Sequence, residues 1–343
     1  MPESPEVPAG FSADFSADFS GSAERYRPEL LAHCYRMLGS IHDAEDLVQE
    51  TYLRAWRGFD RFEGRSSVRR WLYRIATTAC LTALETRARR PLPSGLGAPS
   101  DDHRVAVAPR EPSVQWLQPI PDTLSGAGSL AADPAVVVAG RAGVRLAFVA
   151  ALQYLPARQR AVLTLRDVLA FRTAEVAEML DSTPAAVDSA LRRARAHLAE
   201  QRPLPDDMSE PDDGSLRALL DTYVDAFTRA DTNALVSAMR ADVEMEMPPI
   251  PTWFTGRDAV VGFLGSRVLR RPGLWRMVPT RANGQPAFVV YERHSGDHTD
   301  GDYRAYGVQV LTLAEGRIAR VTAFNDPALV DTFGFAPSVA AGP

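Results

Sequence analysis

The chain has 343 residues, of which 45% are hydrophobic and 24% charged, and its formal net charge is −5. This length is typical of two or three domains, and the composition is that of a globular protein with enough apolar residues for several cores. No apolar run approaches the ~18 residues that span a membrane, and the first residues lack the basic start and apolar core of a signal peptide, so membrane and secreted classes are disfavoured and a cytoplasmic protein is expected.

Positive charge is concentrated in two segments despite the acidic total. Residues 25–92 hold 13 Arg against 8 acids, and residues 158–199 hold 7 Arg against 5 acids. Residues 201–214 carry five acids and one Arg, and residues 215–330 balance at 13 of each sign. The two Arg-rich segments could contact phosphates, so the net charge does not exclude nucleic acid as a partner.

The first 24 residues contain a Phe-Ser-Ala-Asp repeat and are predicted to be a disordered tail. Helical patterns then fill residues 25–92. Pro28 suits the first turn of a helix that runs to Leu38, and Gly39 suits its end. Cys34 and Cys80 lie within apolar helical patterns, which favours buried free thiols over a disulfide or a metal site.

The segment 43–56 is the most informative helix of the chain. Asp43 is a candidate cap for its start. Its apolar stripe consists of Val48, Tyr52, Ala55 and Phe59. Acids, an amide, Arg54 and Trp56 remain on other faces, which is typical of a docking surface because Arg and aromatic anchors are enriched at interfaces. A solvated outer face is the alternative, and Trp56 could belong to either the contact surface or the core.

A basic aromatic helix follows the loop at 60–67. It is predicted to begin at Val68 with Ser67 as its cap. Its core stripe is Leu72, Ile75 and Ala79. Arg65, Arg69, Arg70 and Arg74 are interleaved with Trp71 and Tyr73. This mixture is expected where single-stranded DNA is held by charge and stacking, although Trp71 could equally be a core residue.

Residues 93–139 are predicted to be a linker, since Pro, Gly, Ala and Ser dominate them. The segment 116–122, with the sequence Trp-Leu-Gln-Pro-Ile-Pro-Asp, is too apolar and specific for a passive tether. We expect it to dock in extended form on a neighbouring surface.

Residues 140–200 return to helices and contain a helix-turn-helix pattern. Thr173 is a candidate cap for a short helix, residues 181–183 form a tight turn, and Pro184 opens a second helix. Apolar residues of the two helices face each other: Val176, Ala177 and Leu180 on the first, Val187, Leu191 and Ala194 on the second. A helical hairpin of some other bundle is the alternative.

The second helix of this pattern carries small and basic side chains on its outer face. They are Ala185, Ser189, Arg192, Arg193 and Arg195. Arg can bond guanine edges or grip phosphate, and small side chains let a helix sit deep in the major groove. The segment is therefore a candidate DNA-reading helix.

An acidic linker is predicted at 201–214, and residues 215–330 change character. A helical stripe between 216 and 227 is followed by period-two segments at 243–247, 287–291, 303–313 and 318–324. Asn283-Gly284 and Glu315-Gly316 are turn signals. Helices followed by antiparallel strands predict an α+β domain, with a tail at 331–343. The expected fold class is multidomain, with two all-α domains followed by this α+β domain.

The helical segments resemble the sigma-70 family of bacterial sigma factors, in particular its extracytoplasmic-function (group IV) type. The resemblance lies in the 43–56 segment, the basic aromatic helix, and the order Leu-Pro-Ala-Arg-Gln-Arg-Ala-Val at 155–162 before the helix-turn-helix. It covers residues 25–92 (sigma region 2) and 141–200 (sigma region 4).

The resemblance implies specific contacts. Core RNA polymerase, at the clamp of its largest subunit, would be contacted by Asp46, Gln49, Glu50 and Leu53. The minus-ten promoter element would be read and opened, and a base extruded from it would be received by the loop residues Phe62, Gly64, Ser66 and Ser67. Further contacts with this element would come from Arg69, Arg70, Trp71, Tyr73 and Arg74. The helix at 184–199 would read the minus-thirty-five element.

Residues 215–330 resemble the SnoaL-like cone shared by polyketide cyclases and ketosteroid isomerases. The resemblance lies in the helical stripe, the strand at 242–247, and Phe-Thr-Gly-Arg-Asp at 254–258 before a helix. Such cones hold an apolar pocket, and its expected lining is Tyr223, Trp253, Trp275, Tyr291 and Tyr306. Carboxyl groups for acid–base chemistry are available at Asp221, Asp225, Glu244, Glu246 and Asp326, but no spacing singles out a pair.

The sequence therefore predicts a sigma factor that binds core RNA polymerase and promoter DNA. It is expected not to be an enzyme and to need no metal or other cofactor, with the cone acting as a ligand sensor or intramolecular regulator. A small ligand and an anti-sigma factor stay open as further partners. The alternatives are a helix-turn-helix regulator that acts without core polymerase, and an isomerase- or cyclase-like enzyme that uses the cone.

Overall fold

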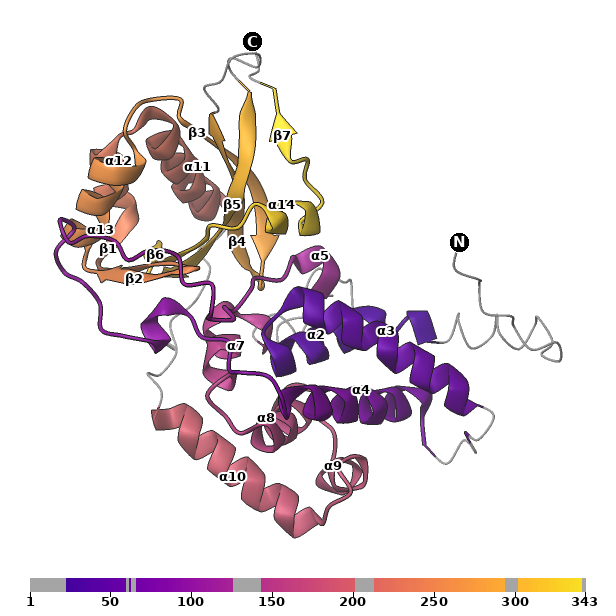
Figure 1. Cartoon of the computed structure of the whole chain (residues 1–343). Coiled ribbons are helices and arrows are strands. Elements are labelled where there is room, and N and C mark those ends of the chain that lie inside the picture. Colours follow the sequence, from indigo (N-terminus) through magenta and orange to yellow (C-terminus); the bar gives the residue numbers. More distant parts are fainter. Residues whose placement is uncertain are drawn as a thin grey trace.

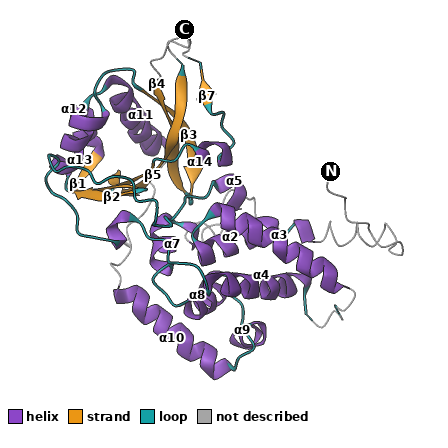
Figure 2. Cartoon of the chain, in the orientation of Figure 1, coloured by secondary structure: helices purple, strands orange, loops and turns teal. Residues whose placement is uncertain are grey.

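A computed structural model describes residues 23–59, 62, 66–125, 143–200, 213–293 and 302–340. Helical domains lie at one end of the molecule and a strongly curved sheet with its own helices lies at the other (Figures 1 and 2). Residues 1–22 of the predicted tail, residues 201–212 of the predicted acidic linker and residues 126–142, which include the end of the long linker, fall outside the described residues.

The first domain is built from helices α2 (Arg27–Leu38), α3 (Ile41–Gly58) and α4 (Val68–Leu84). Gly39 ends α2 with φ 70°, and the Ser67 hydroxyl caps α4 by accepting from Arg70 N at 3.2 Å, both as predicted. The prediction that Asp43 caps α3 is wrong. Ser40 is the cap, and its hydroxyl accepts from the Asp43 backbone N–H at 3.2 Å.

The second domain contains α7 (Leu146–Leu152), α8 (Ala157–Leu163), a π-helical turn η3 (Thr164–Val168), α9 (Thr173–Met179) and α10 (Pro184–Glu200). Pro184 opens α10 as predicted, and the apolar residues expected between α9 and α10 are buried. Thr173 is the first residue of α9 rather than its cap. The Glu175 carboxylate accepts instead from the Arg172 backbone N–H at 2.8 Å, which fixes the start of the helix.

The third domain begins with α11 (Asp213–Arg229) and α12 (Thr232–Ala238), and α13 (Arg257–Phe263) with its π-helical extension η4 (Leu264–Val268) interrupts its strands. The strands are β1 (Met239–Met247), β2 (Ile250–Thr255), β3 (Trp275–Ala282), β4 (Gln285–Arg293), β5 (Tyr303–Ala314), β6 (Arg317–Phe324) and β7 (Ser338–Val339). Their order is β2-β1-β6-β5-β4-β3, with β7 on β5. The α+β class is confirmed, but β1 and β6 pair in parallel, so the expectation of a purely antiparallel sheet is wrong.

The predicted tail at 331–343 is part of this domain as far as residue 340. Helix α14 (Ala328–Thr332) buries Val330, and Phe333 is also buried. Strand β7 then pairs with β5 through Tyr303 and Val339. These apolar residues leave water by covering the sheet, which a free tail could not achieve.

The two faces of the sheet pack against different partners. One face and helices α11–α13 enclose the cone core, which includes Tyr223, Met245, Trp275 and Phe288. The opposite face shares one continuous apolar core with both helical domains, through Val289, Tyr291, Val308, Val310 and Phe324. The third domain is therefore anchored to the helical domains by buried apolar surface.

Two of the residues expected to line the cone lie elsewhere. Tyr291 packs in the core shared with the helical domains, and the Trp253 indole N–H donates to Gly97 O of the linker at 2.9 Å. Strand alternation is the reason: Met245 pairs with Phe254 inside the cone, so neighbouring Trp253 points to the other face. Tyr223 and Trp275 do lie in the cone core, and Tyr306 lies against it.

The linker is docked along most of its described length. A 3-10 turn η2 (Pro93–Gly95) lies against the sheet, and Ser100 forms a bridge with Phe254 of β2. The docking expected for the segment 116–122 is confirmed, because Leu117 and Ile120 are fully buried. The described part of the linker ends in a short helix α5 (Asp122–Ser125).

Candidate polymerase- and DNA-binding surfaces

The outer face of α3 carries the residues predicted to dock on a partner. Asp46 and Gln49 are exposed, and Leu53 is 49% exposed. Glu50 lies beside them and forms an ion pair with Arg54 at 2.7 Å. Trp56, left open between contact and core, is 48% exposed and extends this surface. Exposed large apolar side chains beside acids are typical of protein–protein interfaces.

The aromatic residues at the start of α4 form a cluster next to the predicted base-accepting loop. Phe62 stacks on Trp71 with ring centroids 4.8 Å apart, and Phe59 lies 6.1 Å from the same indole. Trp71 and Ser66 are half-buried, and Ser67 is exposed. Gly64 and its neighbours at 63–65 fall outside the described residues. The cluster offers a surface on which an unstacked base could lie.

The prediction gave Tyr73 a DNA-facing role, but the structure places it elsewhere. The side chain is fully buried, its hydroxyl donates to a Glu29 carboxylate oxygen at 3.1 Å, and its ring meets His33 edge-on at 5.2 Å. Burial, followed by the charge of Glu29, raises the pKa of Tyr73. In this arrangement Tyr73 is a core residue, because α2 packs against it on one side and Phe171 of the second helical domain on the other.

The basic residues of α4 differ in their surroundings. Arg69 forms an ion pair with Glu29 at 2.8 Å and lies over the Phe171 ring at 4.9 Å. Arg70 faces Glu175 and Glu178 of α9. Arg74 is exposed on the outer surface. Positive charge is thus present where it was predicted, but two of the three guanidinium groups are already engaged.

Helix α10 presents its predicted DNA-reading face to solvent. Ala185, Arg192 and Arg193 are exposed, while Ser189 is half-buried and accepts from Arg192 at 3.4 Å. Arg195 is exposed but forms two hydrogen bonds with Asp167, at 2.7 and 2.9 Å. The hydrogen bonds and charge of Asp167 raise the pKa of Arg195. Arg195 therefore ties α10 to the π-helical turn η3, although it lies on the outer side of α10.

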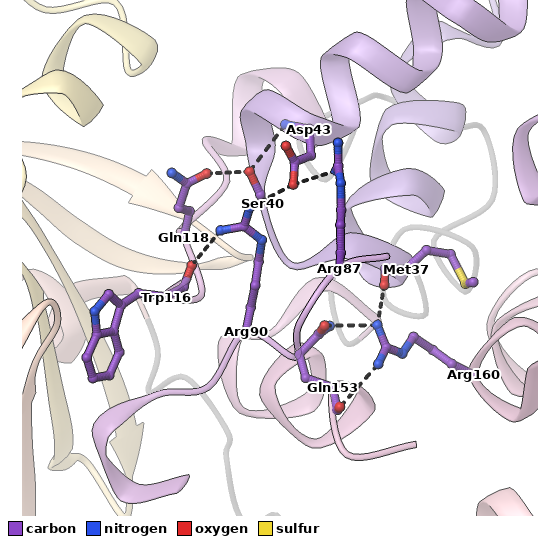
Figure 3. Close-up of polar contacts among 9 residues, drawn as sticks. All are labelled: Met37, Ser40, Asp43, Arg87, Arg90, Trp116, Gln118, Gln153 and Arg160. Atoms are coloured by element: carbon purple, nitrogen blue, oxygen red, sulfur yellow. Dashed lines mark hydrogen bonds and ion pairs between the residues drawn. The ribbon is translucent and has the colours of Figure 1, made fainter. Parts of the chain in front are cut away.

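Polar contacts between the two helical domains involve residues that the sequence analysis did not single out (Figure 3). The Arg160 guanidinium of α8 reaches Met37 O at the end of α2, and it also donates to Gln153 Oε1 at 2.9 Å. Arg36 Nε donates to Gly143 O at 2.8 Å. A cation at a helix C-terminus meets the negative end of the helix dipole, which suits Arg160 to this position. Burial lowers the pKa values of Arg36 and Arg160 to about 10.

The start of α3 is tied to the linker. Asp43 accepts ion pairs from Arg87 at 2.8 Å and Arg90 at 2.7 Å, and Arg90 also donates to Trp116 O at 3.2 Å (Figure 3). The Ser40 hydroxyl donates to Gln118 Oε1 at 2.7 Å. The N-terminus of α3 is thus used to hold the linker, while its middle turns, with Asp46, Gln49 and Leu53, stay exposed.

The turn between β3 and β4 joins the third domain to both helical domains. Asn283 Nδ2 donates to Tyr35 Oη at 2.9 Å and to Val144 O at 2.6 Å, while its Oδ1 accepts from Ile120 N at 3.1 Å. Gly284 N donates to Asp122 Oδ1 at 2.7 Å. One buried amide therefore touches region 2, the linker and the segment that leads into region 4. No sequence signal beyond the Asn-Gly turn pointed to it.

The carboxyl groups considered for acid–base chemistry have other surroundings. Asp221 and Asp225 are exposed on α11, and the Asp326 carboxylate accepts from Ala328 N at 3.0 Å at the start of α14. Glu244 contacts Arg320, and Glu246 accepts from Ser94 N of the linker at 3.0 Å. Inside the cone, the Tyr223 hydroxyl donates to Gln309 Oε1 at 3.1 Å.

Comparison with known proteins agrees with this geometry. Residues 23–90 match the family described as sigma-70 region 2, residues 145–198 match sigma-70 region 4, and residues 220–321 match the SnoaL-like domain. The chain is 47% identical to the ECF RNA polymerase sigma factor SigG of Mycobacterium tuberculosis over 94% of this chain and 85% of that protein. It is 28% identical to SigJ of the same organism over 89% of this chain and 90% of that protein.

The crystal structure of Mycobacterium tuberculosis SigJ is similar in fold. It aligns with a TM-score of 0.56 at 22% identity, and the alignment covers 92% of this chain and 100% of that one. Within the described residues, no helix combines the length and apolar character needed to cross a membrane.

Proposed function

The chain belongs to the extracytoplasmic-function family of RNA polymerase sigma factors, and from that premise we propose that it binds core RNA polymerase and directs it to promoters in the cytoplasm. In this proposal α3 docks on the clamp of the polymerase, α4 and the loop before it read and open the minus-ten element, and α10 reads the minus-thirty-five element. The polymerase supplies the chemistry, and the sigma factor supplies the choice of promoter.

The docking part of this proposal rests on the exposure of the outer face of α3. Leu53 and Trp56 are each about half exposed, although burying such side chains in a core would be favourable. Asp46 and Gln49 flank them. An apolar centre with polar groups at its rim is the arrangement found in protein–protein interfaces, and Trp is enriched among residues that dominate binding energy.

Replacement of Asp46 and Gln49 by Ala tests this assignment. Neither side chain lies on the buried stripe of α3, so the free energy of unfolding should change by less than about 0.5 kcal/mol per site. Affinity for purified core polymerase should fall by roughly tenfold, as for the loss of about 1.4 kcal/mol at an interface. A matched control replaces Asp221 and Asn233 by Ala, which removes an exposed acid and an exposed amide from α11 and α12. Equal core affinity for the two double variants would contradict the assignment.

For the third domain we propose a regulatory role, in which its contacts set how freely the two sigma regions can separate. The Asn283 turn supports this role because it is bonded to region 2, to the linker and to the segment before region 4. A catalytic role finds less support, since the candidate acids are exposed or are bonded to the linker, to Arg320 or to a helix start. The domain would then act by biasing an equilibrium between closed and open arrangements.

A further inference from the structure

We propose that, in the protein free of polymerase, helix α9 of region 4 shields part of the DNA-binding face of α4, with Glu175 and Glu178 taking the place of DNA phosphates on Arg70. The inference rests on the proposed function, since it takes α4 to be a DNA-binding helix. It adds a contact within the sigma regions themselves, separate from the contacts of the third domain.

The acid pair is placed to neutralise one guanidinium. Arg70 Nη1 lies 3.7 Å from Glu175 Oε1, and Arg70 Nη2 lies 3.5 Å from Glu178 Oε2. The two acids are three residues apart on α9, so their side chains lie on the same face of that helix. Arg binds a phosphate through the same guanidinium nitrogens. The two carboxylates therefore compete with a phosphate for the charge of Arg70.

Region 4 also covers the neighbouring basic and aromatic groups of α4. The Phe171 ring, which lies just before α9, meets Tyr73 edge-on at 5.2 Å. The Arg69 guanidinium lies beside both rings, 4.9 Å from the centroid of Phe171 and 5.0 Å from that of Tyr73. Figure 1 shows α9 next to α4 at the base of the molecule. The shield therefore consists of an acidic part over Arg70 and an aromatic part over Arg69.

This packing is incompatible with simultaneous binding of both promoter elements. The minus-ten and minus-thirty-five elements are about 25 base pairs apart, which at ~3.4 Å per base pair is roughly 85 Å along straight DNA. Helix α10, which would read the distal element, follows α9 directly, and α9 touches α4. Regions 2 and 4 must separate on a promoter, and this separation removes the acids from Arg70.

The acid pair is suited to a reversible contact. The Glu178 side chain is 60% exposed and the Glu175 side chain 32% exposed, so solvent and salt screen both pairs. Buried Arg160, through Met37 O, and Arg36, through Gly143 O, hold the helical domains together independently of this pair. Removal of the two charges should therefore change the availability of Arg70 without unfolding the protein. Gln at position 175 can still accept from the Arg172 backbone N–H and preserve the start of α9.

The experiment measures binding of the full-length protein, without polymerase, to a fluorescent single-stranded oligonucleotide of mixed sequence over a range of NaCl concentrations. The double variant Glu175→Gln, Glu178→Gln should bind roughly threefold to fivefold more tightly at low salt, as for one added phosphate contact. The slope of log affinity against log salt should steepen by about 0.7. The control, Asp181→Asn with Glu200→Gln, removes two exposed acids of region 4 that make no ion pair with Arg70 among the described residues.

Addition of Arg70→Ala to the Glu175→Gln, Glu178→Gln variant should abolish the gain. The inference is overturned if the gain is absent, if the control shows an equal gain, or if the gain survives the loss of Arg70. Core polymerase binding, measured in parallel, separates this inference from the proposed function. If the wild type binds core polymerase normally but the double variant gains no DNA affinity, the shield is contradicted and the sigma-factor proposal is not. If the double variant gains DNA affinity but the wild type does not bind core polymerase, the sigma-factor proposal is contradicted and the shield is not.

Discussion

Buried polar residues determine how the helical domains meet. Arg36 and Arg160 are almost fully buried, and each donates to a backbone carbonyl group across the interface between regions 2 and 4: Arg36 to Gly143 O and Arg160 to Met37 O. A buried charge without such partners would be strongly unfavourable, so these contacts fix one relative position of the two domains. The sequence could not indicate this role, because nothing local distinguishes these Arg residues from those that face solvent.

His33 makes the stability of the helical domains depend on pH. Burial, followed by the positive charge of Arg36, lowers the pKa of His33 from 6.5 to about 3. Below pH 6.5 the unfolded chain takes up a proton at this residue that the folded protein excludes. The contribution of neutral His33 to stability is therefore complete above pH 6.5 and is lost as the pH falls toward 3, by up to about 1.4 kcal/mol per pH unit.

Urea unfolding of the wild type and of His33→Gln at pH 7 and pH 5.5 measures this effect. Gln can still bond the Thr77 hydroxyl, which lies 2.9 Å from His33 Nε2, but it does not titrate. The variant should lose less stability between the two pH values than the wild type, and His42→Gln, at an exposed position, should behave like the wild type. An equal pH dependence in the wild type and in His33→Gln would contradict the assignment.

At the scale of single elements, helices were predicted well where local capping chemistry sets their bounds. Pro28, Gly39, Ser67 and Pro184 mark helix ends in the sequence and in the structure alike. Asp43 is a plausible cap by residue type, but Ser40 directly precedes the first helical residue, Ile41, and takes that role.

Strands were predicted where period-two patterns are clean, and β2 and β3 were missed. Both lie at the edges of the sheet and contain Pro, at positions 251 and 279. Pro is tolerated at edges because an edge strand has backbone groups without a partner strand. The linker covers the free edge of β2, with Ser100 N donating to Trp253 O at 2.9 Å. Such pairing depends on the tertiary fold, so it could not be predicted from the residues of the linker.

The turn between β3 and β4 carries a specific prediction. Replacement of Asn283 by Ala removes three side-chain hydrogen bonds to buried partners and places Ala at φ 56°, at a cost of about 2–5 kcal/mol to the closed arrangement. Trypsin should then cleave the linker after Arg104 or Arg110 at least about tenfold faster, since 1.4 kcal/mol corresponds to a factor of ten in the open population.

Glu315→Ala is the matched control for this change. Glu315 has φ 53° in the turn between β5 and β6, where it forms an ion pair with Arg240 away from the helical domains. Glu315→Ala introduces the same backbone strain at this distant turn, so the rate at which trypsin cleaves the linker should not change. A cooperative thermal transition in both variants shows that the fold is retained, and equal cleavage rates in both would mean that Asn283 does not hold the linker.

At the scale of the whole molecule, the three domains form one closed body. The sheet face that includes Val289 and Val308 shares its apolar core with both helical domains, and the linker lies between them. The sequence predicted the domains and their order, but not this packing, because an apolar run such as that of β4 indicates burial on both faces without indicating which domain covers each face. Tyr73 illustrates the point, since it packs against Phe171 of region 4 as well as against His33 of its own domain.

The central claim is that this protein enables core RNA polymerase to start transcription at specific promoters. The most direct test is run-off transcription from a library of genomic promoter fragments, with core polymerase alone, with core polymerase and the protein, and with core polymerase and the Asp46→Ala, Gln49→Ala variant. The account predicts discrete transcripts that require the protein and are reduced with the variant at limiting concentration. If the protein adds no transcript to those made by core polymerase alone, the account is contradicted.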